Sequence, residues 1–154
     1  MNRKPSETDK VKVKKLALRV GNAMKYKFYF EATWILSLIF ERKLGKIIEI
    51  SDPRNQQNPT LSLAQSIQKI RSMQASPDYI LLTDNLDPML VERIRRWKIK
   101  RNIVYKRMTL ITVADNRLEE LANEGILIYK ALNKSAKALR FGRSSPEKDN
   151  EIPD

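Results

Sequence analysis

Short apolar runs rich in β-branched residues alternate with helix-like segments along this chain, and the alternation constrains the fold more than any other feature. The runs read KIIEIS, YILLT and MTLITVA, and a fourth run, ILIYKAL, begins at Ile126. The first three are apolar enough to be buried on both faces, as the strands of a parallel sheet are. The order of the segments predicts an α/β protein, a single-domain three-layer α/β/α sandwich with a mostly parallel sheet.

Cap residues mark three helix starts between and after these runs. Asn58 and Asp87 each precede a proline that would occupy the first helical position, and Asn116 and Glu119 have the spacing of a capping box. The helices predicted from these starts cover about residues 59–73, 88–98 and 116–124.

An earlier helix is predicted from the apolar periodicity of residues 28–44, with Gly45 as its C-terminal stop. Residues 11–20 begin with alternation and then lose it, which indicates a short strand or the entry to a helix. In the later helices the side chains expected to face the core are Leu63, Ile67, Ile70, Leu90, Ile94 and Trp97.

The length and composition indicate one folded domain. The chain has 154 residues, of which 42% are hydrophobic and 31% charged, as in globular proteins that bury their own core. Residues 1–10 and 144–154 are polar and unpatterned. We therefore expect a disordered N-terminal arm over 1–10, a single α/β domain over 11–143 and a disordered C-terminal tail over 144–154.

The chain contains neither cysteine nor histidine. Thiolate zinc sites, disulfides, Ser-His triads and imidazole bases are thereby excluded, and the absence of cysteine suits a cytoplasmic protein. The longest apolar run, Ala32–Phe40, is about half of the roughly 20 residues that a membrane-spanning helix requires. With a polar N-terminus as well, the sequence predicts a cytoplasmic protein without export signal or membrane partner.

The densest basic segment reads RIRRWKIKRNIVYKR, from Arg93 to Arg107. It holds eight cations in 15 residues and no acid, within a chain whose formal net charge is +12. Such a segment is typical of a surface that binds a polyanion, and arginine favours bidentate contacts with phosphate. On the predicted helix, Arg93, Arg96 and Lys100 would form one outward ridge. The nucleic-acid-binding residues predicted from this segment are Arg93, Arg95, Arg96, Lys98, Lys100, Arg101, Lys106 and Arg107.

The leading functional hypothesis is a non-enzymatic protein that binds nucleic acid without a cofactor. RNA is preferred over DNA as the partner because no motif for reading the groove of a duplex is visible. An acidic protein that docks on the same basic surface is an alternative partner.

A second alternative, a nuclease, depends on aspartates that follow the predicted strands. Asp52, Asp84 and Asp115 each come after one of the apolar runs, and Asp87 lies just beyond the second. At one edge of a parallel sheet these carboxylates would hold Mg²⁺ or Mn²⁺ for phosphodiester hydrolysis, with Asp52, Asp84 and Asp115 as the metal ligands. Aspartates at such positions also cap helices, which fully accounts for Asp87.

The stretch DYILLTDNLDPMLVERIRRWKIKRNIVY resembles the central strand-helix-strand of the kink-turn-binding ribosomal protein superfamily, and LEELANEGILI resembles its next helix and strand. The resemblance covers residues 60–130 at most and implies an α/β/α fold that binds RNA. In that family a Gly-x-Asn-Glu segment contacts the RNA, and here the corresponding region, Asn58–Lys69, lacks the Gly and the Glu.

The acidic element Thr83–Asp87 is also similar to the S-D-x-D element of PIN-like nucleases of the NYN type. The segment Asp52–Asn55 is similar to the first D-x-x-N of that family. This resemblance implies the metal-dependent nuclease given above as the alternative.

Overall fold

Helices are the main secondary structure of the described part of this chain. The computed structural model describes residues 6–52, 54, 61–111 and 115–143. Within these ranges there are six helices and no strand, so the predicted α/β/α sandwich with its parallel sheet is wrong, and the protein is all-α in these ranges. The helices are α1 (Ser6–Lys25), α2 (Tyr29–Ser51), α3 (Leu63–Gln74), α4 (Ile80–Asn85), α5 (Pro88–Met108) and α6 (Asp115–Arg143).

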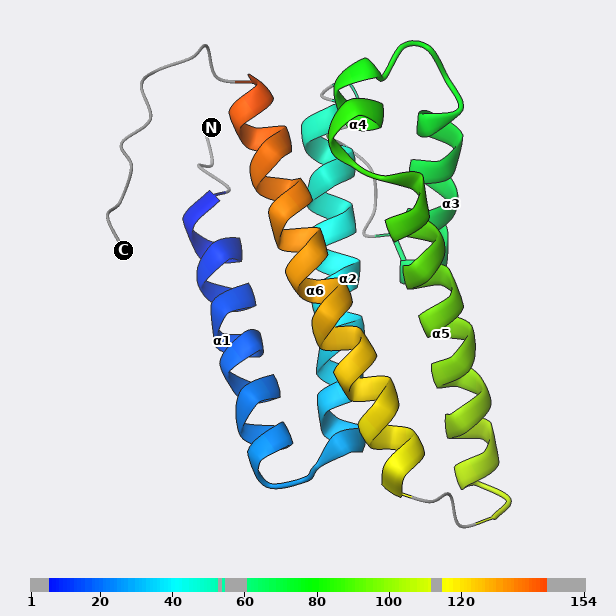
Figure 1. Ribbon diagram of the computed structural model, residues 1–154. Coiled ribbons are helices and arrows are strands. Elements are labelled where there is room, and N and C mark those ends of the chain that lie inside the picture. The colour runs from blue at the N-terminus through cyan, green and yellow to red at the C-terminus, as the bar shows by residue number, and fades with distance from the viewer. Residues whose placement is uncertain (1–5, 53, 55–60, 112–114, 144–154) are drawn as a thin grey trace.

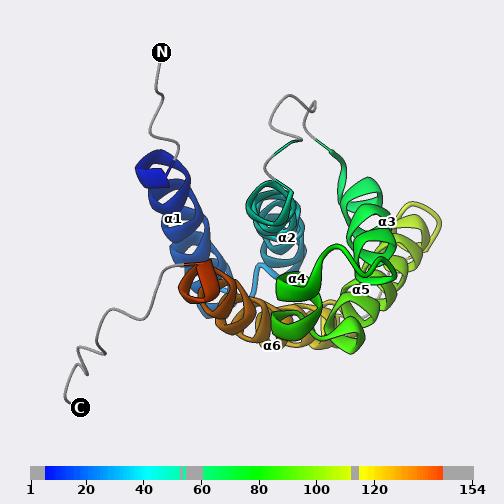
Figure 2. The ribbon, with the colours of Figure 1, turned by 90° about the horizontal axis from the view of Figure 1, so that it is seen from above.

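Helix α2 occupies the middle of the bundle. It packs against α1, α3 and α6, while α6 also packs against α4 and α5 (Figures 1 and 2). The C-terminal ends of α1 and α5 and the N-terminal ends of α2 and α6 lie together at the lower end of the bundle in Figure 1. None of the described helices combines the length and the apolar character that a membrane span requires.

The first predicted strand, KIIEIS, is the last part of α2. Ile47 and Ile48 are buried, whereas Lys46 and Glu49 form an ion pair of 3.2 Å on the outside, so the run has the two faces of a helix. Isoleucine is only slightly unfavourable in helices, and burial against neighbouring helices outweighs so small a preference. The helix passes through Gly45, the predicted stop, and ends at Ser51, two residues before Pro53.

The second predicted strand, YILLT, supplies most of the short helix α4. Among the residues of α4 only Leu82 is buried, while Ile80 and Leu81 are exposed, so this run lacks the two covered faces of a central strand. The third run, MTLITVA, begins at the end of α5, and its residues 112–114 lie outside the described part. The fourth, ILIYKAL, lies inside α6, where Ile128 and Leu132 are buried.

The predicted helix starts have mixed outcomes. The start at Asp87 is confirmed, because its Oδ1 accepts a hydrogen bond of 2.8 Å from the backbone N–H of Met89. Asn58 lies outside the described residues. Helix α3 begins at Leu63, and its N-cap is Ser62, which forms a capping box with Gln65. Helix α6 begins at Asp115, one residue before the predicted cap.

The predicted ends and boundaries are also revised. Helix α5 extends ten residues beyond Lys98, to Met108, and α6 extends from the predicted end near Glu124 to Arg143. Residues 11–20 belong to α1, which begins at Ser6, inside the segment predicted to be an arm. The tail over 144–154 lies outside the described residues, and the division into arm, domain and tail stays a prediction.

Trp97 is the largest fully buried side chain, and it joins three helices. Its ring meets Phe40 of α2 edge to face, with centroids 5.1 Å apart. Its Nε1–H donates a 2.8 Å hydrogen bond to the backbone carbonyl of Leu121 in α6. The expectation that Trp97 faces the core is thus confirmed, and the same holds for Leu63, Ile67, Ile70, Leu90 and Ile94.

Candidate nucleic-acid interface

All eight cations predicted to bind nucleic acid lie on α5, and three of them are paired with acids of the chain itself. Glu92 accepts hydrogen bonds from Arg95 at 2.8 and 2.9 Å and from Arg96 at 3.0 Å. The hydrogen bond from Arg95, followed by that from Arg96, lowers the pKa of Glu92 to about 2, although its partial burial opposes this shift. Glu92 therefore stays ionised near neutral pH and offsets part of the charge of both arginines.

Lys100 has an acidic partner on the neighbouring helix. Its Nζ lies 3.1 Å from Oε2 of Glu124, and this ion pair links α5 to α6. The predicted ridge of Arg93, Arg96 and Lys100 is exposed to solvent. Only Arg93 in that ridge has no ion pair within the described residues.

Arg101 is half-buried between α5 and α2. Its guanidinium lies over the rings of Trp97 and Tyr105, at 5.9 and 5.7 Å from their centroids, and donates to the hydroxyl of Ser37. Burial lowers the pKa of Arg101 from its usual value. These contacts make Arg101 a link between helices rather than an outward-facing cation.

Tyr105 forms a second link between the same two helices. The Thr33 hydroxyl donates to the carbonyl of Phe30 at 2.9 Å, so in the 2.6 Å contact with the Tyr105 hydroxyl it is left to accept. The ring of Tyr105 also contacts that of Phe30, with centroids 4.8 Å apart. Burial raises the pKa of Tyr105 from its usual value, while the bond to Thr33 opposes this shift.

The other four predicted residues have no acidic partner among the described residues. These are Arg93, Lys98, Lys106 and Arg107, which we call the free cations of α5. Arg93, Lys106 and Arg107 are exposed and Lys98 is partly buried. Lys106 and Arg107 lie in the final turn of α5, where positively charged side chains interact favourably with the helix dipole.

A cluster of aromatic and basic residues at the same end of the bundle was missed by the sequence reasoning. It is formed by Lys25–Phe30, which covers the turn between α1 and α2 and the adjoining helix ends, together with Tyr105–Arg107 of α5, and we call it the turn end. Tyr26 and Phe28 are exposed to 63% and 59%. Their centroids lie 6.2 Å apart, and Lys25 Nζ lies 5.7 Å from the Tyr26 ring. The signal was present in the sequence as KYKFYF, in which two lysines alternate with aromatic residues.

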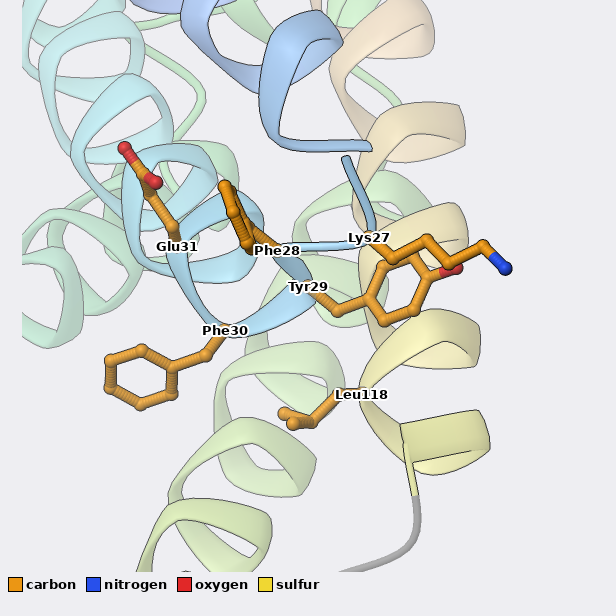
Figure 3. Close-up of a pocket in the computed structure, with 6 residues that line it drawn as sticks. All are labelled: Lys27, Phe28, Tyr29, Phe30, Glu31 and Leu118. Carbon is orange, nitrogen blue, oxygen red and sulfur yellow. The ribbon is translucent and has the colours of Figure 1, made fainter. Parts of the chain in front are cut away.

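A hollow of about 470 Å³ lies beside this turn, lined from the turn and from α6. Figure 3 shows Leu118 of α6 facing the turn from below, while the side chain of Lys27 extends outward alongside Tyr29. Glu31, the acid in this lining, is paired with Arg19 at 3.1 Å. The hollow is therefore bordered by aromatic surface and an exposed cation, and its acid is paired with Arg19.

The aspartates of the nuclease alternative do not share a sheet edge, because the described residues contain no sheet. Asp87 caps α5, Asp52 accepts a 3.4 Å hydrogen bond from the Tyr79 hydroxyl, and Asp84 is exposed in α4. The side chain of Asp115 lies outside the described part, but α6 begins at the opposite end of the bundle from the end of α2 (Figure 1). Among the described residues, no three acids are grouped so that they could hold a metal ion.

A further group of cations lies between α2 and α6. Lys43 of α2 lies with its Nζ 5.6 Å from the ring centroid of Tyr129 on α6. Burial, and then the positive charges of Arg140 and Lys137, lower the pKa of Lys43 to about 8. The folded chain therefore holds the Lys43 ammonium less favourably than the unfolded chain does.

Replacing Lys43 by Met is expected to stabilise the protein at pH 7 by about 1 kcal/mol, after a discount for the part of the side chain that solvent screens. Below pH 8 Lys43 is protonated in both the folded and the unfolded chain, so the full cost of burying its charge lowers the stability. This cost declines as the pH rises from 8 to 10.5. Urea unfolding at both ends of this range should show the difference between variant and parent shrinking. A difference in the free energy of unfolding that does not depend on pH would mean that the charge of Lys43 is not the cause. Lys134→Met, at an exposed position of α6, serves as the control.

Comparison of the chain with protein-family models, with curated proteins and with solved structures returns no match. The two resemblances found in the sequence therefore gain no support from relatives, and the α/β/α fold that the first implies is contradicted by the helices.

Proposed function

We propose that this chain is a cytoplasmic, non-enzymatic protein that binds nucleic acid, RNA in preference to DNA, through the free cations of α5. The observation that carries the proposal is that Arg93, Lys98, Lys106 and Arg107 lack an acidic partner in the described residues of a chain with a net charge of +12. Unpaired cations can neutralise phosphates without first breaking an ion pair, and the counterions released by the nucleic acid favour binding.

Pairing divides the cations of α5 into two classes with different expected contributions. Arg95, Arg96 and Lys100 must exchange a carboxylate partner for a phosphate, so the net gain from a new contact is small. Arg93, Lys106 and Arg107 exchange only water. The same number of charges removed from each class should therefore have different effects on binding.

The test is a pair of triple variants with equal loss of charge. Arg93→Gln, Lys106→Gln and Arg107→Gln form the first, and Arg95→Gln, Arg96→Gln and Lys100→Gln form the matched control. For a single-stranded RNA of about ten nucleotides, the first triple should flatten the slope of log affinity against log salt by about 2, from about 0.7 for each lost phosphate contact. The control should flatten it by clearly less.

Fluorescence anisotropy across a salt series measures both slopes, with duplex RNA and duplex DNA as further probes. Circular dichroism checks that each variant is folded. Equal slopes for the two triples would contradict the assignment to the free cations, and equal affinity for RNA and DNA would contradict the preference. Probe cleavage on a denaturing gel in Mg²⁺ or Mn²⁺ would contradict the non-enzymatic part, and absence of binding at moderate salt would leave an acidic protein as the partner of this surface.

A further inference from the structure

We infer that the turn end holds the bases of a single-stranded segment, with Tyr26 and Phe28 as stacking rings, so that the protein prefers single strands to duplexes. The inference rests on the proposed function and deepens it, because the free cations alone would recognise any polyanion. Its basis is the exposure of two neighbouring rings, the cations around them and the conformation of Lys27 between them.

The two rings form an exposed pair at the turn end. The centroids of Tyr26 and Phe28 are 6.2 Å apart, with an angle of 31° between the ring planes. Both side chains are exposed, so each ring offers a face on which a base can stack. Base stacking on such rings is independent of sequence, because every base has a π-face.

The charges around the rings favour a polyanionic strand over a neutral apolar partner. Lys25 and Lys27 flank Tyr26 in the turn, and the contact between Phe30 and Tyr105 brings the last turn of α5, with Lys106 and Arg107, to the same end. Leu118 of α6 lines the hollow. The acids that follow it, Glu119 and Glu120, are rotated from it by about 100° and 200° around the helix axis, so they lie on other faces of α6. Exposed aromatic rings surrounded by cations are the arrangement used by proteins that bind single strands.

Lys27 is held in a conformation that a glycine would adopt more easily. Its φ is 60°, its N–H donates to the carbonyl of Met24 at 3.1 Å, and the N–H of Phe28 donates to that of Ala23 at 2.8 Å. This pattern is a Schellman motif, in which glycine is preferred because a side chain at positive φ is strained. The turn therefore keeps a cation next to both aromatic residues in the sequence at a cost in stability, and Lys27→Gly offers a variant that removes the cation without weakening the fold.

The first measurement compares three probes of about ten nucleotides each on the unmodified protein. They are oligouridylate, an abasic ribose-phosphate oligomer with the same charge, and an RNA duplex. Oligouridylate should bind at least about fivefold more tightly than the abasic oligomer, because only its bases can stack. Equal affinity for the two single strands overturns the inference.

The second measurement uses the double variant Tyr26→Leu, Phe28→Leu, which keeps apolar bulk but removes both rings. Its affinity for oligouridylate should fall about tenfold or more, while its affinity for the abasic oligomer and the duplex stays unchanged. Trp34→Leu is the matched control, since Trp34 is exposed to 55% further along α2 and outside the turn end. A fall of the same size in the control, or for all three probes, overturns the inference.

Lys27→Gly separates binding from folding. The variant should unfold at a higher temperature than the parent and bind all three probes about two- to threefold more weakly, through the loss of one phosphate contact. Unchanged binding by this variant would remove Lys27 from the site.

Failure of this inference is distinguishable from failure of the proposed function. If the triple variant of α5 weakens all probes while the ring variant changes none, polyanion binding stands and base stacking falls. If no oligonucleotide binds but vesicles containing phosphatidylserine do, both are overturned in favour of a membrane surface, on which exposed aromatics and cations also gather.

Discussion

Replacing Trp97 by Ala is expected to lower the free energy of unfolding by about 3–5 kcal/mol, the range for removal of a large aromatic ring from a closed core. The ring is completely buried between α2, α5 and α6. Its removal eliminates the edge-to-face contact with Phe40 and the hydrogen bond to the carbonyl of Leu121, and leaves a cavity that rigid helices cannot fill. Such a loss is a large part of the stability of a small domain.

Urea unfolding followed by circular dichroism measures this effect, and the second tryptophan provides its control. Trp34 is exposed to 55%, so Trp34→Ala should change the free energy of unfolding by less than about 1 kcal/mol. In the Trp97 variant, fluorescence from Trp34 gives an independent transition curve. Similar losses in the two variants would show that Trp97 is not the centre of the core.

Gly125→Val is expected to destabilise the protein by about 3 kcal/mol, at the upper end of the range for overpacked cores. A Cβ atom at Gly125 would lie 2.8 Å from Cδ1 of Leu36 and 3.1 Å from Cζ2 and Nε1 of Trp97. The absence of a side chain therefore lets α6 approach α2 and α5 closely, and the two methyl groups of valine would extend further into both neighbours.

Gly45 of α2 is the matched control, because a Cβ atom there meets nothing within 4 Å. Gly45→Val should be neutral or stabilising by less than about 1 kcal/mol, since valine is a better helix former than glycine. The double variant Trp97→Ala, Gly125→Val gives a sharper test. The space left by the indole admits the valine, so the double loss should be smaller than the sum of the single losses by about 1 kcal/mol or more. Additive losses would mean that the two residues do not share this contact.

Local signals in the sequence were sufficient for several helix features. The Asp87-Pro88 step located the start of α5, and the spacing of Leu90, Ile94 and Trp97 identified the face of α5 that is buried. Both depend on contacts within one or two turns, so they do not require knowledge of the neighbours.

The candidate site was predicted only in part, because pairing across helices is invisible in a linear chain. The partner of Lys100 is Glu124, 24 residues away in the sequence. The guanidinium of Arg101 donates a hydrogen bond to the hydroxyl of Ser37, 64 residues away.

The pairs of Glu92 with Arg95 and Arg96 lie within about one turn of α5 and could be read from the sequence, whereas the contacts of Lys100 and Arg101 could not. The sequence therefore located the basic segment but could separate its free cations from its paired ones only in part. The aromatic part of the turn end was visible in the sequence as KYKFYF, but its contact with Tyr105 of α5 was not.

The sequence by itself determined that this chain is basic, that it has neither cysteine nor histidine, and that it contains amphipathic helices, one of which begins after Asp87. Only the tertiary structure decided between helix and strand for runs such as KIIEIS and ILIYKAL. The intrinsic helix propensities of β-branched residues are less favourable than that of alanine by well under about 1 kcal/mol, whereas burial of one isoleucine side chain contributes about 1.5–3 kcal/mol. In α2 and α6 these runs are buried against neighbouring helices, and that packing determines their structure.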